Sequence, residues 1–319
     1  MKKEKMRIKV GISTCLLGQR VRFDGGHKHD RYITDILGEF FEFVPVCPEV
    51  AIGMGTPREA VRLQGEVSAP RLVGVKSGRD WTNRMNTYAR KRVQLFVNQP
   101  ISGYILKKDS PSCGMERVRV YGNTGMPTRH GRGLYAAELL KQLPFLPVEE
   151  EGRLNDVKLR ENFIVRVFAY HRLQNLFNEN YSRAELVRFH TVHKYLLLAH
   201  SPERYKKLGQ LVADLKKYSP AQMREAYSRM FMETLAFKTT TSKNVNVLQH
   251  ILGFLKKHLT ALEKQDLLNV INEYHRQLVP LIVPVTLLKH YLNKYEIIYI
   301  RDQVYLNPHP KELMLRNHV

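Results

Sequence analysis

The chain of 319 residues is long enough for two ordinary domains, and its 43% hydrophobic content excludes an intrinsically disordered protein. Its net charge of +21 is shared: residues 1–150 hold 25 basic and 15 acidic side chains, and residues 151–319 hold 26 and 15. An evenly basic chain favours a polyanionic partner such as nucleic acid. Because no apolar run approaches the roughly 18 residues of a transmembrane helix, we expect no membrane partner.

The N-terminal segment begins with several lysines and continues into an apolar run, as a signal peptide would. That run is short, Lys9 interrupts it, and no small-residue cleavage site follows, so we expect a strand in a cytoplasmic protein. The three cysteines cannot all pair with one another, and a disulfide framework is therefore not expected.

The first half alternates between short apolar or β-rich runs and helical patterns. Each of the runs ends at a turn, which predicts strands at residues 8–13, 41–46 and 101–106. Helical patterns cover residues 30–40, 80–98 and 134–142. Strands that alternate with helices predict an α/β domain with a parallel sheet over residues 1–150.

The character of the chain changes near residue 150. The segment LPFLPVEEEGRLND, with two prolines and three consecutive acids, predicts a domain boundary. Beyond it we expect an all-α domain over residues 151–319, apart from a possible strand at 297–300. The predicted helices cover residues 158–178, 183–199, 203–217, 219–236, 244–260, 263–278 and 284–295. Helix-capping serines support three of their starts, at Ser182, Ser201 and Ser219.

Every cysteine follows one of the predicted strands: Cys15 in STCLLG, Cys47 in VPVCPE and Cys113 in KKDSPSCG. Ligands bind beyond the carboxyl ends of the strands in an open parallel sheet, so the thiols gather at one edge if the strands are neighbours. Three thiolates suit zinc or an iron–sulfur cluster. A structural zinc site takes four protein ligands, and the nearest histidines, His27 and His29, are typical of solvated loop residues.

The same segments resemble the thiouracil desulfidase family. The resemblance spans residues 8–148 through ISTCLLG…VRFDGG, VPVCPE…GMGTPRE and KKDSPSCG. The second half, with FHTVHKYLLLAHSPERY, resembles the helical domain fused to it in bacterial tRNA 4-thiouridine desulfidases. The resemblance implies a 4Fe-4S cluster held by Cys15, Cys47 and Cys113, with one open iron, and non-redox replacement of sulfur by oxygen on a thiolated nucleobase.

The resemblance also implies a catalytic pair, Glu49 and Ser110. Glu49 would take a proton from water, and Ser110 would hydrogen-bond the developing anion or relay a proton. Each residue has a simpler alternative. An acid at the position of Glu49 complements a helix dipole, and a hydroxyl at Ser110 caps a turn. Asp109 or Ser112 could also hold the role given to Ser110.

Four further residues are candidates for substrate binding. Asp24 and Gly25 in RFDGG shape the substrate pocket or make a turn. Lys107 and Lys108 flank the loop of the third cysteine and hold phosphates or form solvated surface.

The resemblance and the charge together imply an iron–sulfur enzyme that converts 4-thiouridine in tRNA to uridine, with catalysis in residues 1–150 and tRNA binding in residues 151–319. Two alternatives stay open. One is a desulfidase that acts only on free thiolated bases, and the other is a non-catalytic RNA-binding redox sensor. The pairing of Glu49 with Ser110 favours an enzyme, and the basic helical half favours RNA.

Overall fold

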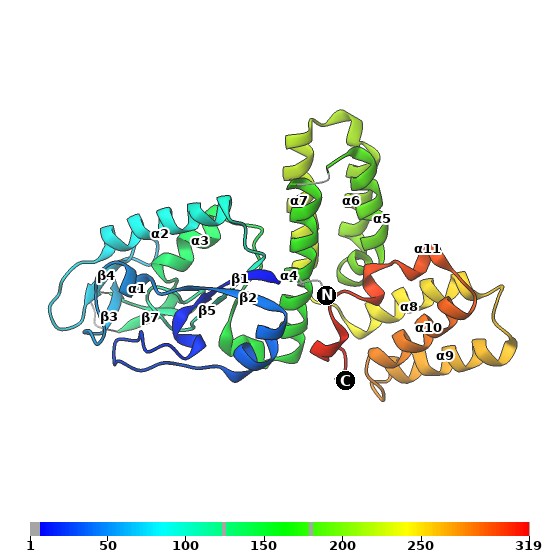
Figure 1. The fold of residues 1–319 in the computed structure, drawn as a ribbon, viewed down its shortest axis with the longest axis horizontal. Helices are drawn as coiled ribbons and strands as arrows, with labels where there is room; N and C mark the ends of the chain where they lie inside the picture. The colour runs from blue at the N-terminus through cyan, green and yellow to red at the C-terminus, as the bar shows by residue number, and fades with distance from the viewer. Residues whose placement is uncertain (1–6, 123–125, 179–180, 319) are drawn as a thin grey trace, which may run out of the picture. The chain divides into compact units, whose positions relative to one another are not determined.

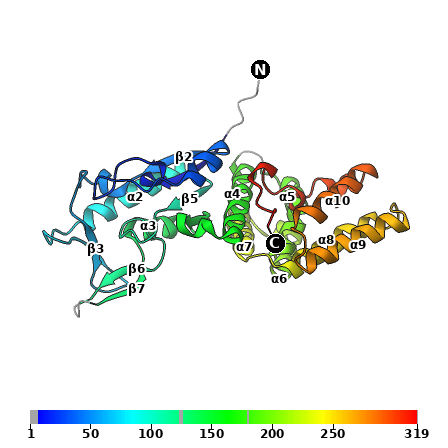
Figure 2. The ribbon, with the colours of Figure 1, turned by 90° about the horizontal axis from the view of Figure 1, so that it is seen from below.

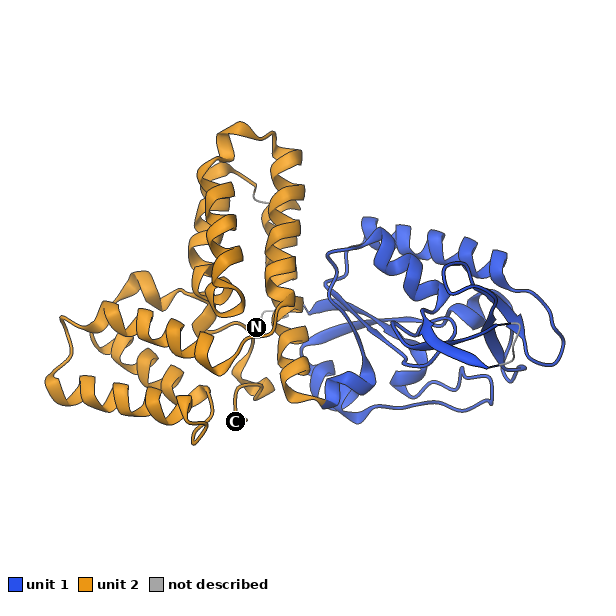
Figure 3. Cartoon of the chain, turned by 180° about the vertical axis from the view of Figure 1, so that it is seen from behind, with its two compact units in different colours: residues 1–155 blue, residues 156–319 orange. Residues whose placement is uncertain are grey.

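The computed structural model describes residues 7–122, 126–178 and 181–318. The chain separates into two compact units, residues 1–155 and 156–319, which Figure 3 colours differently. The division falls at the end of the segment LPFLPVEEEGRLND, so its three consecutive acids belong to the first unit. The first six residues, with the lysines of the N-terminal segment, lie outside the described residues.

A four-stranded sheet forms the base of the first unit, and all its neighbouring strands run parallel. β1 (Ile8–Ser13) lies between β2 (Phe41–Val46) and β5 (Gly103–Leu106), and β8 (Val148–Glu150) pairs with the outer side of β5. Every residue of β5 is buried, as is typical of a parallel sheet covered on both faces. The α/β fold class predicted for the first half is confirmed.

Two helices cover the sheet in the first unit, α2 (Thr82–Asn98) and α3 (Leu134–Gln142), and they lie side by side (Figures 1 and 2). The ring of Tyr104 on β5 lies 6.1 Å from that of Phe96 on α2 and 6.0 Å from that of Tyr135 on α3. On β1, a Cβ atom at Gly11 would collide with the Tyr104 ring. A glycine there lets the aromatic core lie directly against the central strand.

The first unit also contains a second sheet that the sequence did not predict. Its strands are β4 (Arg71–Gly74), β3 (Val61–Gln64), β6 (Val118–Tyr121) and β7 (Pro127–Gly131), in that order across the sheet. The predicted helix at residues 30–40 is instead a π-helical turn over Tyr32–Ile36 followed by a 3-10 turn over Leu37–Glu39.

The second unit is helical, as predicted. Its long helices are α4 (Val157–Asn178), α5 (Arg183–His200), α6 (Pro202–Ala213), α7 (Pro220–Ala236), α8 (Thr241–Leu255), α9 (Ala261–His275) and α10 (Ile282–Lys294). The side chains of Ser182, Ser201 and Ser219 each accept a backbone N–H at a helix start, which confirms the predicted caps. Within the described ranges, no helix is both long and apolar enough to cross a membrane.

The strand expected at residues 297–300 is wrong. The segment forms the one-turn helix α11 (Ile298–Arg301), and the amide of Arg301 bonds to the carbonyl of Ile297 over 3.2 Å. Its backbone is thus satisfied locally, without a partner strand. Ile298 and Tyr299 are both exposed, whereas Ile300 is buried. Only one residue of the apolar run 297–300 therefore packs into the core, and the run is not a buried strand.

Candidate active site

The three cysteines lie at one edge of the parallel sheet. Because β1, β2 and β5 are neighbours, the segments that follow them start from the same side. Cys15 lies in a 3-10 turn (Thr14–Leu17), Cys47 directly precedes the short helix α1 (Pro48–Ala51), and Cys113 lies in the loop after β5. All three line one cavity of about 470 Å³, within the range of roughly 300–1,000 Å³ typical of small-molecule sites.

Burial controls the electrostatics of these thiols. It raises the pKa of Cys15 to about 11, against the opposing effect of nearby Lys107. Burial likewise raises the pKa of Cys47 and lifts that of Cys113 well above its ordinary value, and the nearby Glu49 carboxylate adds to both increases. The free thiols are therefore protonated, and a cationic metal centre would favour their thiolate forms.

The donor set at this edge is sulfur-rich. His27 and His29 bond to each other, with the amide of His29 donating to Nδ1 of His27 over 3.2 Å. Within residues 7–122, 126–178 and 181–318, no group of three or more His, Cys, Asp or Glu side chains is arranged to hold a single metal ion. The three cysteines nevertheless line one cavity.

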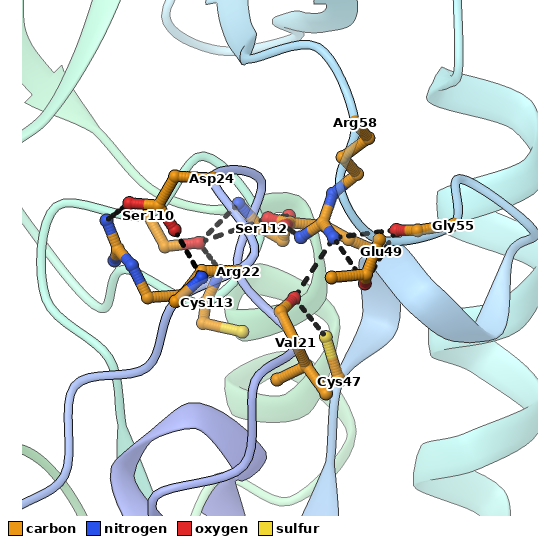
Figure 4. A network of polar contacts seen from close by, with 12 residues as sticks. Val21, Arg22, Asp24, Cys47, Glu49, Gly55, Arg58, Ser110, Ser112 and Cys113 are labelled. Carbon is orange, nitrogen blue, oxygen red and sulfur yellow. Dashed lines mark hydrogen bonds and ion pairs between the residues drawn. The ribbon is translucent and has the colours of Figure 1, made fainter.

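Two side chains hold Glu49 in place beside the thiols (Figure 4). Arg58 forms an ion pair with Oε2, and the hydroxyl of Ser112 donates to Oε1 over 2.5 Å. Arg58 also donates to the carbonyls of Val21 (3.0 Å) and Gly55 (2.9 Å), and its side chain is only 4% exposed. The carboxylate is consequently fixed at the cavity wall by a buried cation and a buried hydroxyl.

Ser110 is both a turn cap and a neighbour of Glu49. Its hydroxyl accepts the amides of Ser112 (3.2 Å) and Cys113 (3.1 Å) and lies 3.5 Å from Oε1 of Glu49. Ser110 lines the cavity, whereas Ser112 is fully buried. Of the two hydroxyls, that of Ser110 can meet a bound molecule and that of Ser112 orients the carboxylate.

Two of the acids at residues 149–151, near the end of the first unit, also hold the loop after β5 that carries Cys113. Glu151 pairs with Lys107 over 2.5 Å and accepts the amide of Lys108 over 2.8 Å. Glu150 accepts the amide of Met115 over 2.7 Å. Lys107 and Lys108 both line the cavity, and the charge of Lys107 is already paired with Glu151.

Asp24 and Gly25 form a turn outside the set of residues that line the cavity. Asp24 accepts the amide of Gly26 over 3.0 Å and pairs with Arg22 over 3.4 Å, while Gly25 has a φ of +74°, which favours glycine. The neighbouring Arg22 and Phe23 line the cavity instead. The RFDGG segment therefore contributes its first two residues, Arg22 and Phe23, to the wall of the cavity.

Sequence reasoning gave no role to Arg58 or Phe23. Arg58 belongs to the GMGTPRE segment, and an arginine close in sequence to a carboxylate such as Glu49 is a signal for an ion pair. Phe23 precedes the Asp24 turn, and only the structure reveals that it lines the cavity.

Two family descriptions match this chain. That of 2-thiouracil desulfurase matches residues 10–151, and that of DUF1722, a protein of unknown function, matches residues 194–310. The uncharacterized protein YbbK of Bacillus subtilis (strain 168) is 33% identical over 152 residues, which cover 46% of this chain and 97% of YbbK. The chain belongs to the 2-thiouracil desulfurase family.

Two further proteins are similar to this family member. The uncharacterized protein YbgA of Escherichia coli (strain K12) is 29% identical over 165 residues, which cover 51% of this chain and 98% of YbgA. The solved structure of TudS, a 4Fe-4S-dependent thiouracil desulfidase, is 34% identical and covers 49% of this chain and 98% of its own, with a TM-score of 0.40.

Gly133 controls the position of the third cysteine. A Cβ atom at Gly133 would collide with the backbone of Ser112 and with the amide of Cys113. We expect Gly133→Ala to displace this loop at a cost of about 1–3 kcal/mol, so that Cys113 is alkylated about 5- to 150-fold faster in metal-free protein. Mass spectrometry of the labelled peptides measures the rate.

Gly122→Ala is the matched control for this test, because a Cβ atom there meets no atom within 4 Å. Alkylation of Cys15 in the Gly133→Ala protein serves as an internal reference. Equal Cys113 rates in the parent and Gly133→Ala proteins would contradict the packing described for this loop.

Proposed function

We propose that the chain is a cytoplasmic 4Fe-4S-dependent desulfidase that converts 4-thiouridine in tRNA to uridine and releases hydrosulfide. The observation that carries the proposal is the convergence of Cys15, Cys47, Cys113 and Glu49 on one cavity. Membership of the 2-thiouracil desulfurase family supports a thiolated nucleobase as the substrate. Three free, unpaired thiols agree with a reducing compartment.

In this proposal Cys15, Cys47 and Cys113 hold the cluster. Three thiols around one cavity suit a cluster that leaves one iron without a protein ligand. Such a cluster, when bound, supplies a Lewis acid with an open position for a soft sulfur atom.

The surrounding side chains supply the remaining chemistry. The reaction replaces the sulfur of the thiocarbonyl by the oxygen of water, and the sulfur leaves as hydrosulfide. Glu49 accepts a proton from that water as a general base. Arg58 and Ser112 hold its carboxylate in one orientation, since they bind different oxygens. Ser110, on the cavity side, donates a hydrogen bond to the charge that develops on the ring.

The cavity wall also suits a flat pyrimidine. Val21, Phe23, Val61 and Pro111 provide apolar surface, and the exposed ring of Phe23 offers a face on which a base can stack. Lys108 supplies a cation at the same wall for a neighbouring phosphate.

To reach a base inside folded RNA, a protein has to bind the RNA backbone and expose the base. The second half of the chain, with 26 basic and 15 acidic side chains, has the positive charge needed to bind the phosphate backbone. We therefore assign catalysis to the first unit and tRNA binding to the second.

Anaerobically purified protein is expected to contain about four irons per chain with matching sulfide, as a 4Fe-4S cluster requires. Cys15→Ser, Cys47→Ser and Cys113→Ser should each lower the iron content and bleach the visible absorbance. Iron, sulfide and zinc assays on the same samples provide the measurement. Stoichiometric zinc without sulfide would exclude the cluster.

Glu49→Gln should keep the iron but lower the rate of sulfide release by roughly 10²-fold or more, because the amide cannot accept the proton. Ser110→Ala should cause a smaller loss. Glu59→Gln is the matched control, since Glu59 belongs to the same motif but binds Ser77 and the amide of Lys76 outside the cavity. A Glu49→Gln protein with normal iron and normal turnover would remove Glu49 from the mechanism.

A further inference from the structure

Aromatic rings surround one lysine on the surface of the second unit. The aromatic patch consists of Lys194, Tyr195, His250, Phe254 and Tyr299, which come from α5, α8 and the short helix α11 (labelled in Figure 1). The Nζ atom of Lys194 donates to the hydroxyl of Tyr299 over 2.9 Å and lies 4.7 Å from the centroid of that ring. It also lies 4.7 Å from the ring of Tyr195 and 5.7 Å from that of Phe254.

Much of the aromatic patch faces solvent. Phe254 is 41% exposed and Tyr299 is 54% exposed, and their ring centroids lie 6.0 Å apart. His250 is exposed beside Tyr195, at 6.5 Å between ring centroids. Single exposed rings are ordinary, but adjoining exposed rings around a cation indicate a binding surface.

Lys194 is a charged amine that no carboxylate of the described residues neutralises. Burial lowers its pKa, but the hydrogen bond from Lys194 to Tyr299 and the nearby tyrosines outweigh that effect and raise the pKa overall, so the amine is charged. Two similar cations in the unit are neutralised: Lys294 beside Tyr295 pairs with Glu263, and Arg204 pairs with Glu233. In the described part of the chain, no carboxylate forms an ion pair with Lys194.

We propose that the aromatic patch binds an unpaired nucleotide of tRNA, with the base stacked on Phe254 and Tyr299 and a neighbouring phosphate held by Lys194. Stacking on exposed aromatic rings next to a cation is the usual chemistry of single-stranded nucleic-acid binding. An unneutralised lysine on a chain of net charge +21 complements a polyanion better than an apolar protein segment. This inference rests on the proposed tRNA function and names the surface that performs it.

The test uses full-length, cluster-loaded protein and purified tRNA in a titration series from low to high salt. Phe254→Ala and Tyr299→Ala are each expected to weaken tRNA binding by about 5- to 150-fold at every salt concentration, because a stacked base is lost. Lys194→Gln should instead reduce the slope of log K against log salt by about 0.7–0.9, because one phosphate contact is lost. Sulfide release from free thiouracil should not change in any of these variants.

Phe237→Ala is the matched control, since Phe237 is 46% exposed beneath Arg204, whose charge is paired with Glu233. Tyr299→Phe keeps the ring and should keep the affinity, which separates stacking from a loss of folding. If the parent protein binds tRNA but the Phe254 and Tyr299 variants bind equally well, the aromatic patch does not bind tRNA and this inference is wrong. If the parent protein itself binds no tRNA, the proposed function fails together with it.

Discussion

The parallel pairing of β1 with both β2 and β5 is the constraint on which the candidate site depends. Ser13 lies opposite Val46 in the register of the first pair, so the segments of Cys15 and Cys47 leave the sheet at the same level. Ile12 lies opposite Ile105 in the second pair, which brings the loop of Cys113 to the same edge. Thiols separated by 32 and 66 residues in sequence thereby line one cavity without any local motif.

Charge pairing then fixes the loops around that cavity. Arg58 and Glu49 neutralise each other at one wall, and Lys107 and Glu151 do so at another. These groups are largely buried, so removing one partner would leave an uncompensated buried charge. That charge lowers the free energy of unfolding by far more than an exposed ion pair raises it. Paired charges in the first unit thus hold the loops that line the cavity, whereas Lys194 of the second unit forms no ion pair with a carboxylate of the described residues and donates to the hydroxyl of Tyr299.

The sequence predicted the features that depend on a continuous local pattern. The strands at residues 8–13 and 41–46 are apolar or β-rich runs of six residues, and the helices of the second unit show long periodicities with serine caps. The second sheet was missed because its strands have only four or five residues and carry arginines, although Val118 and Val120 alternate with an exposed Arg119. The acids at 149–151 predict a boundary in the sequence because the partners of two of them lie far away along the chain: Lys107 pairs with Glu151, and the amide of Met115 donates to Glu150.

The source of the oxygen atom in the product tests the proposed desulfurisation most sharply. Intact, cluster-loaded protein would be incubated anaerobically with tRNA containing 4-thiouridine in ¹⁸O-labelled water, and the nucleosides analysed by mass spectrometry. Hydrolytic desulfurisation should give uridine that carries one ¹⁸O atom and one equivalent of sulfide for each 4-thiouridine lost. Unchanged 4-thiouridine in tRNA that the protein binds, or uridine without ¹⁸O, would contradict it.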